Sequence, residues 1–293
     1  MMDARTLTIS LGGKWHHRYG TAPCPVCQSQ QRQGQNALTL ADGDAGLLAH
    51  CKKTDCAFRD ILGAVGIAPG GYTPPDPATL AQREADRKAE DKRRANQAFA
   101  VWKEAQQITG TVAETYLRGR GIACDLPETL RFHPACWHGA TATRHPAMVA
   151  LIEGGGDFAV HRTYLRADGA GKAGLKPDKA MLGAASGGAV RLTDDPGPLV
   201  VAEGLETALS LACGLLQRPV TIWAALSTSG MRGLALPPSP GRLTIAPDGD
   251  DAGRSAAFAL AERAHALGWT VSTLPAPNGR DWNDILQMKG GQV

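Results

Sequence analysis

The chain has 293 residues, of which 43% are hydrophobic and 20% charged, and its 31 Lys and Arg nearly balance its 28 Asp and Glu. This length suits two or three domains, and the apolar content excludes a wholly disordered chain. The formal net charge of +3 is too small to indicate nucleic-acid binding by itself. Evidence for such a role must therefore come from local sites.

The hydrophobic runs and the cysteine content indicate the cellular location of the protein. The sequence contains no apolar run of the roughly 18–20 residues that a membrane helix needs. Its first residues lack the apolar segment of a secretory signal. Seven cysteines are a low and odd number for a chain of this length, which argues against a disulfide scaffold. We therefore expect a soluble, cytoplasmic protein with no membrane partner.

Residues 1–70 contain four of the seven cysteines, in two pairs. Two such pairs supply four thiolates, the ligand set of a tetrahedral structural Zn²⁺ site. A segment this poor in large apolar side chains would gain its folding energy from the metal. We therefore expect a zinc-binding ribbon rather than four unconnected thiols or a redox motif. Its predicted ligands are Cys24, Cys27, Cys51 and Cys56, with His16, His17 and His50 as possible substitutes.

Residues 71–110 are expected to form a linker and one long helix. Pro and Gly block regular structure in the first few residues. The stretch from Leu80 to Ile108 then has no internal Pro or Gly. Only its second half has an apolar stripe, so only that half is expected to pack. The charged first half predicts a solvated spacer rather than a nucleic-acid contact.

Residues 111–195 are expected to form a basic α+β domain. A capping-box pattern from Thr111 to Glu114 predicts a helix that ends at Gly119 or Gly121. Glycine-separated apolar runs then predict strands at 147–152, 158–165 and 189–192. His133, Cys136 and His138 are compatible with a second metal site, although a simple loop is the favoured interpretation.

Residues 196–293 alternate short apolar strands with helices. The strands are expected at 199–202, 220–226, 242–246 and 269–274, and the helices at 205–213 and 252–267. This alternation predicts a Rossmann-like parallel sheet with both faces covered.

Acidic residues follow the strands of this last segment. Glu203 follows the first strand, Asp248 and Asp250 the third, and Asp281 and Asp284 the fourth. Ligands bind at the carboxyl ends of the strands in such sheets, so these side chains are expected to converge. Hard oxygen ligands suit Mg²⁺ or Mn²⁺, which support phosphoryl transfer. The alternative to metal binding is that Asp250 and Asp251 cap the helix that follows them. For Glu206, a functional role and a capping or surface role are equally well supported.

Three motifs in a fixed order resemble the Toprim domain of bacterial-type primases, topoisomerases and some nucleases. They are EGLETAL at 203–209, DGDDAG at 248–253 and GRDWND at 279–284. The variant they resemble most occurs in primase-like proteins of plasmids, phages and mobile elements. The resemblance implies that Glu203 is a general acid/base and that Asp248 and Asp250 bind metal, with Asp281 or Asp284 as a third metal-side residue. Pro247 departs from the family pattern, in which small residues are common before the first Asp.

Two further segments resemble parts of the same primases. Residues 159–183 resemble the domain that precedes Toprim there, which implies that Arg162 and Lys179 are catalytic cations facing nucleotide or template. Lys172 and Lys176 are second candidates. The cysteine module resembles the N-terminal zinc module of phage and plasmid primases, which helps to recognise template DNA. The phosphate contacts implied there are Arg18, Lys52, Lys53 and Arg59.

These observations predict an α/β protein with a C-terminal Toprim domain, preceded by an α+β domain and an N-terminal zinc ribbon. The expected function is a DNA primase that makes short RNA primers on single-stranded DNA from nucleoside triphosphates, with structural Zn²⁺ and catalytic Mg²⁺ or Mn²⁺. The alternatives are a Toprim nuclease and a non-catalytic DNA-binding replication factor. Residues 166–173 do not complete a Walker A motif, because Arg166 and Ala173 stand where Gly and Ser or Thr are needed, so we expect a separate replicative helicase.

Overall fold

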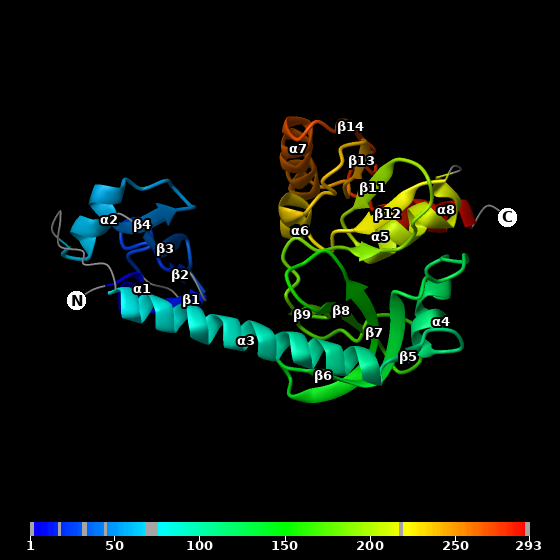
Figure 1. The fold of residues 1–293 in the computed structure, drawn as a ribbon, viewed down its shortest axis with the longest axis horizontal. Coiled ribbons are helices and arrows are strands. Elements are labelled where there is room, and N and C mark those ends of the chain that lie inside the picture. Colours follow the sequence, from blue (N-terminus) through cyan, green and yellow to red (C-terminus); the bar gives the residue numbers. More distant parts are fainter. Residues whose placement is uncertain are drawn as a thin grey trace. The chain divides into compact units, whose positions relative to one another are not determined.

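The computed structural model describes residues 3–16, 19–30, 34–43, 46–67, 76–216 and 219–290. Two compact units, Met1–Glu90 and Asp91–Val293, make up the chain (Figure 1). The expected linker residues 71–75, as well as His17 and Arg18, lie outside the described residues. Within the described part, no helix combines the length and apolarity that crossing a bilayer would require. The domain boundaries expected at 70, 110 and 195 stay predictions.

The first unit is a small antiparallel sheet flanked by two short helices. Its elements are α1 (Ala4–Ser10), β1 (Lys14–His16), β2 (Tyr19–Ala22), β3 (Leu38–Gly43), β4 (Gly46–Cys51) and α2 (Phe58–Ala64), with the strands in the order β1-β2-β3-β4. The Asp3 carboxylate caps α1 by accepting from the Thr6 backbone N–H. The core is small, and two of the four clustered cysteines, Cys24 and Cys51, are buried in it.

Helix α3 (Pro77–Glu104) is the predicted long helix, and it ends before Ile108 because Gln106–Gln107 form a short strand, β5. Its second half packs as expected, with Ala98 and Val101 in contact with the same apolar core as Val149. As expected, no residue of its first half, from Pro77 to Glu90, is buried, but this half does form ion pairs. The Arg83 guanidinium forms ion pairs with Asp3 and with Asp42, the latter at 3.2 Å, because those carboxylates lie beside the helix within the first unit.

The second unit begins with an antiparallel sheet and helix α4 (Val112–Gly119). Its strands are β5, β6 (Leu130–His138), β7 (Thr143–Ile152), β8 (Ala159–Tyr164) and β9 (Lys179–Gly183), in that order. One face packs on α3 through residues such as Val149 and Val160. The opposite face, which includes Met148, joins the core shared with α4 and α5.

Strand β6 corrects the prediction that His133, Cys136 and His138 lie in a simple loop. Pro134 interrupts the alternation of apolar residues, and the strand absorbs it as an irregularity in register between His133 and Cys136. Within the described ranges, these three side chains form no group that could hold a metal. The His138 imidazole instead contacts Thr141 and the carbonyl of Pro177.

The second sheet of this unit is the expected parallel one. Strands β11 (Leu199–Ala202), β12 (Thr221–Ala224), β13 (Arg242–Ala246) and β14 (Thr270–Thr273) run parallel in the order β12-β11-β13-β14. The antiparallel strand β10 (Val190–Arg191), which was expected to belong to the preceding domain, extends the β12 edge. The predicted fold class is confirmed.

Helices cover both faces of the parallel sheet, as predicted (Figure 1). Helix α5 (Leu205–Ser210), continued by a π-helical turn at Leu211–Leu215, and α8 (Trp282–Gly290) pack on one face. Helices α6 (Thr228–Gly233) and α7 (Asp251–Ala266) lie on the other. Sequence analysis missed α6 and α8. Each is short, and α6 contains two glycines that weaken its helical pattern.

A disulfide joins Cys124, which follows α4, to Cys213 in the π-helical turn. The two residues are 89 positions apart, so the bond closes a long loop across the second unit. The remaining five described cysteines are free.

We expect Ellman's reagent to titrate about five thiols in protein denatured with a chelator and no reductant, although the chain has seven cysteines. The chelator removes any metal from the thiols, and the disulfide hides two of them. The same sample treated first with a dithiol reductant and desalted should give all seven. A count of seven without reductant would contradict the bond.

Candidate active site

The order of the parallel strands places two acidic residues side by side. The chain crosses from β11 to β12 on one side and returns to β13 on the other, so the strand order reverses between β11 and β13. Crevices at such a reversal, at the carboxyl ends of the strands, bind ligands. Glu203 directly follows β11, and Asp248 lies two residues beyond β13. The fold therefore brings these two carboxylates to the same edge of the sheet, as predicted.

Two glycines let the acidic loops approach one another closely. A Cβ on Gly249 would lie 1.9 Å from the Pro277 carbonyl oxygen, so only glycine fits there. The Gly249 backbone also bonds the 277–280 loop, with N–H donation to the Arg280 carbonyl at 2.8 Å. A Cβ on Gly253 would lie 3.0 Å from Glu203 Oε2 and 3.1 Å from Asp250 Oδ1. The absence of side chains here allows the carboxylates to surround one small space.

The carboxylates in this space repel one another. Burial, together with the charges of Asp248 and Asp250, raises the pKa of Glu203 to about 7. Burial and the nearby Asp281 and Asp250 raise the pKa of Asp248 to about 6, although a hydrogen bond from Thr207 opposes the rise. Thr207 Oγ1 donates to Asp248 Oδ1 at 3.1 Å. The ionised cluster is therefore unfavourable until a positive charge enters it.

Helix capping accounts for part of the acidic set. The Asp250 side chain accepts from the Gly253 backbone N–H at 2.6 Å and so caps α7. Asp281 and Asp284 accept from each other's backbone N–H groups at the start of α8, at 2.8 and 3.1 Å. The charge of Asp281 also raises the pKa of Asp248, so Asp281 lies near the acidic cluster. The exposed Asp251 pairs with Arg254 at 2.8 Å.

A partly buried ion pair lies beside the carboxylate cluster. Lys179 Nζ on β9 donates to Glu206 Oε2 at 2.9 Å, and Tyr116 Oη on α4 donates to Glu206 Oε1 at 2.8 Å. The Glu206 side chain is only 6% exposed. Although burial alone would raise the pKa of Glu206, the charge of Lys179 holds it well below its usual range. The surface role considered for Glu206 was therefore wrong.

The structure separates the two predicted cations. Lys179 pairs in register with Thr163, and Arg162 with Ala180, so the two side chains point to opposite faces of the sheet. Lys179 faces the carboxylates. Arg162 faces the α3 side, where Nη1 donates to the Trp137 carbonyl at 3.1 Å. The structure does not bring Arg162 to the cluster, and its predicted catalytic role gains no geometric support.

The second-rank cations also differ in position. Lys172 is half-buried near Lys179 and Glu206, and burial followed by the Lys179 charge lowers its pKa. Lys176 is exposed. Burial lowers the pKa of the His161 side chain to about 4, and the charges of Lys179 and Lys172 lower it in the same direction. Lys172 and Lys179 thus form a local basic surface next to the acidic cluster.

Sequence reasoning missed Tyr116 and Thr207, and it left Glu206 undecided between function and a capping or surface role. A signal existed for two of them. Glu206 and Thr207 lie in the first turn of α5, only three and four residues after Glu203, so both could be expected near it. No local signal identifies Tyr116, because its contact with Glu206 spans 90 positions of the chain.

The acidic residues fit a hard divalent cation. Their donor set is entirely oxygen, which Mg²⁺ and Mn²⁺ prefer. Glu203 Oε2 is buried and has no hydrogen-bond partner in the described structure, so it is a free acceptor facing the other carboxylates. Among the described residues, these carboxylate oxygens are not gathered into a metal-holding group as the cysteine sulfurs described next are, so an ion would have to draw them together. Glu203, Asp248 and Asp250 are the residues that would hold such an ion.

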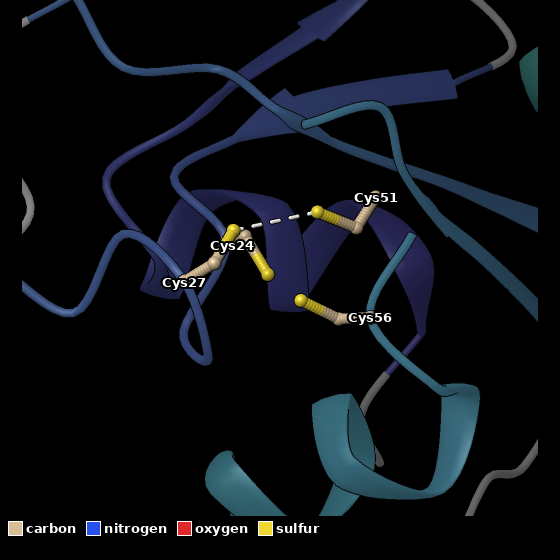
Figure 2. Close-up of side chains that lie close together, drawn as sticks. All are labelled: Cys24, Cys27, Cys51 and Cys56. Atoms are coloured by element: carbon tan, nitrogen blue, oxygen red, sulfur yellow. Dashed lines mark hydrogen bonds between the residues drawn. The ribbon is translucent and has the colours of Figure 1, made fainter. Parts of the chain in front are cut away.

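The four predicted zinc ligands converge in the first unit. Figure 2 shows the sulfurs of Cys24, Cys27, Cys51 and Cys56 pointing toward one another. All four sulfurs lie within 4.8 Å of one another, with 3.5 Å between those of Cys27 and Cys51. This spacing fits the edges of a tetrahedral thiolate site. His16 and His50, considered as substitutes, are not part of the group, and His16 Nε2 contacts Thr21 instead.

The cysteine surroundings favour one thiolate strongly. Burial raises the pKa of Cys24 to about 12. Burial also acts to raise that of Cys51, but backbone N–H groups of Thr54 and Lys53 outweigh it and bring the pKa of Cys51 down to about 5. A cation bound by Cys51 would supply the charge that the other thiols need to ionise. Three basic side chains near the cysteines in sequence are exposed and accessible to phosphate groups, namely Lys52, Lys53 and Arg59.

Comparisons with known proteins agree with this architecture. Residues 198–292 match the family described as Toprim domain, and residues 92–192 match a domain of unknown function, DUF7146. No curated protein matches the chain.

Three solved primase structures are similar to it. A DNA primase domain from Pseudomonas aeruginosa is 20% identical over 67% of this chain and 74% of its own, with a TM-score of 0.42. The zinc-binding and RNA polymerase domains of Aquifex aeolicus primase are 12% identical over 99% and 81%, with a TM-score of 0.39. The RNA polymerase domain of Mycobacterium tuberculosis primase DnaG is 18% identical over 70% and 80%, with a TM-score of 0.40.

The family match coincides with the acidic site. It spans all three motifs on which the sequence resemblance rested, and it begins one residue before β11. The chain is therefore a Toprim-domain protein, with its Toprim domain at residues 198–292.

Proposed function

We propose that the protein is a DNA primase that synthesises short RNA primers on single-stranded DNA by metal-dependent nucleotidyl transfer. A Toprim domain alone is compatible with several reactions, so the proposal must be argued from the site. The observation that carries it is the pairing of an acidic cluster at the sheet edge with two lysines, Lys179 on β9 of the adjoining antiparallel sheet and Lys172 in the segment before β9.

Each half of this arrangement has a task in nucleotidyl transfer. Glu203, Asp248 and Asp250 would hold Mg²⁺ or Mn²⁺, which supplies charge neutralisation at the phosphates and activation of the attacking hydroxyl. The Lys179 ammonium faces the same space and attracts the negative charge of an incoming triphosphate. Glu203, with a pKa of about 7, exchanges a proton near neutral pH and is suited to general acid/base work.

The remaining parts of the proposal concern template and partners. The cysteine cluster, with exposed Lys52, Lys53 and Arg59, would bind Zn²⁺ and contact the phosphates of single-stranded template DNA. Nucleoside triphosphates are the proposed substrates. We further propose a separate replicative helicase as partner and an origin among plasmid, phage or other mobile-element primases, on the strength of the three acidic motifs.

A primer-synthesis assay tests the proposal. Full-length protein is incubated with single-stranded DNA, labelled ribonucleoside triphosphates and Mg²⁺ or Mn²⁺, and products are separated by length. We expect short oligoribonucleotides that need both template and metal and that disappear in the Asp248→Ala and Glu203→Gln variants. Metal-dependent degradation of the template would indicate a nuclease instead. Binding of DNA without turnover, unaffected by these substitutions, would indicate an accessory factor.

A further inference from the structure

The partly buried pair of Glu206 and Lys179 lies where a lysine and a metal ion would compete for the same carboxylates. Lys179 is 31% exposed, and its partner Glu206 lies three residues after Glu203. The residue next to Glu206, Thr207, donates to Asp248 at 3.1 Å, so the ammonium group lies near both metal-side carboxylates. A lysine that moved onto those carboxylates would neutralise them and so take the place of the divalent cation.

Glu206 is built to hold the ammonium group away from that position. It lies one turn after Glu203 on α5, and its side chain is almost fully buried. One carboxylate oxygen accepts from Lys179 at 2.9 Å, while the other is fixed by the Tyr116 hydroxyl at 2.8 Å. Because the Tyr116 side chain is itself buried, this hydrogen bond fixes the orientation of Glu206.

We propose that Glu206, oriented by Tyr116, is a positioning residue that keeps Lys179 from pairing with the metal-side carboxylates Glu203 and Asp248. Glu206 thereby preserves two functions at once, an acidic cluster open to a divalent cation and a lysine directed at the phosphates of the substrate. The inference rests on the proposed function for its context, but its central statement concerns metal binding and can be tested without turnover.

The alternative for this pair is purely structural. A buried ion pair between β9 and α5 could do no more than fix the antiparallel sheet against the Toprim domain. On that view, loss of either partner would disturb the site in the same way, and loss of both would not restore it. The two interpretations therefore differ in the behaviour of the double variant.

The experiment is a Mn²⁺ titration of the full-length chain near pH 8, followed by the electron paramagnetic resonance signal of free Mn²⁺. The wild-type protein should bind Mn²⁺ at a site that the Asp248→Ala variant loses. Glu206→Gln should raise the dissociation constant about tenfold, since removing a residue that supports metal ligands typically has this effect. Gln keeps the shape of Glu206 and its carbonyl oxygen can still accept from Tyr116, but its amide nitrogen cannot accept from Lys179 and the charge that retains Lys179 is removed.

Rescue by a second substitution is the decisive result. The double variant Glu206→Gln/Lys179→Met lacks the competing ammonium group and should bind Mn²⁺ within about twofold of Lys179→Met alone. Tyr116→Phe, which deletes one hydroxyl, should weaken binding in the same direction as Glu206→Gln but less. Glu114→Gln is the matched control, because Glu114 pairs with Arg118 at 2.8 Å on the far side of α4 from this site and should leave binding unchanged.

Three results would overturn the inference. They are unchanged Mn²⁺ affinity in Glu206→Gln, a double variant as weak as Glu206→Gln, and no Asp248-dependent Mn²⁺ site in the wild-type protein. Thermal unfolding of each variant checks that the chain is folded. Failure of primer synthesis with the expected pattern of Mn²⁺ affinities would reject the proposed function and leave the positioning role intact.

Discussion

Exchange of Asp248 for asparagine is expected to reduce metal-dependent nucleotidyl transfer by on the order of 10³-fold or more. Loss of a metal-holding carboxylate removes several kcal/mol of transition-state stabilisation, and each ~1.4 kcal/mol is a factor of ten in rate. Asn keeps the size of Asp248 and can still accept the hydrogen bond from Thr207. Steady-state rates of primer synthesis across a range of Mg²⁺ concentrations measure the effect.

The same substitution is expected to stabilise the metal-free protein. Burial and neighbouring acids raise the pKa of Asp248 to about 6, above its unfolded value of 3.8. Between these values the folded state binds more protons than the unfolded state, so this carboxylate makes stability fall as the pH rises. Above pH 6, Asp248→Asn removes the unfavourable charge and should raise Tm by roughly 2–4 °C in the presence of a chelator. At pH 4 the gain should vanish.

Added Mg²⁺ should reverse the order of stabilities. The wild-type protein binds the cation in its folded state and gains Tm, whereas Asp248→Asn gains little. Because protons compete with the metal, the Mg²⁺ concentration needed for half-maximal activity should rise as the pH falls through about 6. Asp251→Asn is the control, since that exposed side chain pairs only with Arg254 in the described structure. An Asp248→Asn variant that is active or destabilised without metal would contradict this account.

Loss of zinc is expected to unfold the first unit while the second stays folded. Structural Zn²⁺ contributes roughly 10–16 kcal/mol of binding free energy in small zinc modules, more than the small core of residues 4–61 can replace. Cys51→Ala should therefore abolish zinc binding and leave residues 3–67 open to proteolysis. Zinc content by mass spectrometry and limited proteolysis mapped by mass measure both effects.

Cys136→Ala separates this effect from the loss of any buried thiol. Cys136 is also buried, but it belongs to β6 of the second unit and is not one of the four clustered cysteines. The variant should retain its zinc and protect residues 3–67 as the wild-type protein does. Full zinc content in Cys51→Ala, or equal protection of that segment with and without zinc, would show that the four sulfurs do not form a structural site.

Local sequence was sufficient for several parts of this protein. Strands at Leu199–Ala202 and Arg242–Ala246 are formed as predicted, because continuous apolar runs between turn residues have few alternatives to a buried strand. The carboxylates that follow them were placed correctly for the same reason. Each lies within a few residues of a strand end, and all carboxyl ends of a parallel sheet share one edge.

Local sequence was not sufficient where the outcome depended on register or distant contacts. Arg162 and Lys179 are equally basic, yet the pairing of β8 with β9 places them on opposite faces, and a shift of β9 by one residue would bring both to the same face. Pro134 made residues 133–138 look like a loop in the sequence. Only the pairing with β7 shows that β6 continues past Pro134 with an irregular register. The disulfide between Cys124 and Cys213 likewise joins positions that nothing nearby connects.

The sequence by itself determined the chemistry available to this protein: four thiols for zinc, a set of carboxylates for a divalent cation, and the order of the motifs that mark a Toprim domain. Only the tertiary structure decided which groups share a space. Burial acts against the ionisation of both Glu206 and Glu203, but the charge of Lys179 keeps Glu206 ionised despite its burial, whereas burial beside other acids makes ionisation of Glu203 unfavourable. The physical reason is that the ionisation of a carboxylate depends on the charges and solvent around it, and these come from distant parts of the chain.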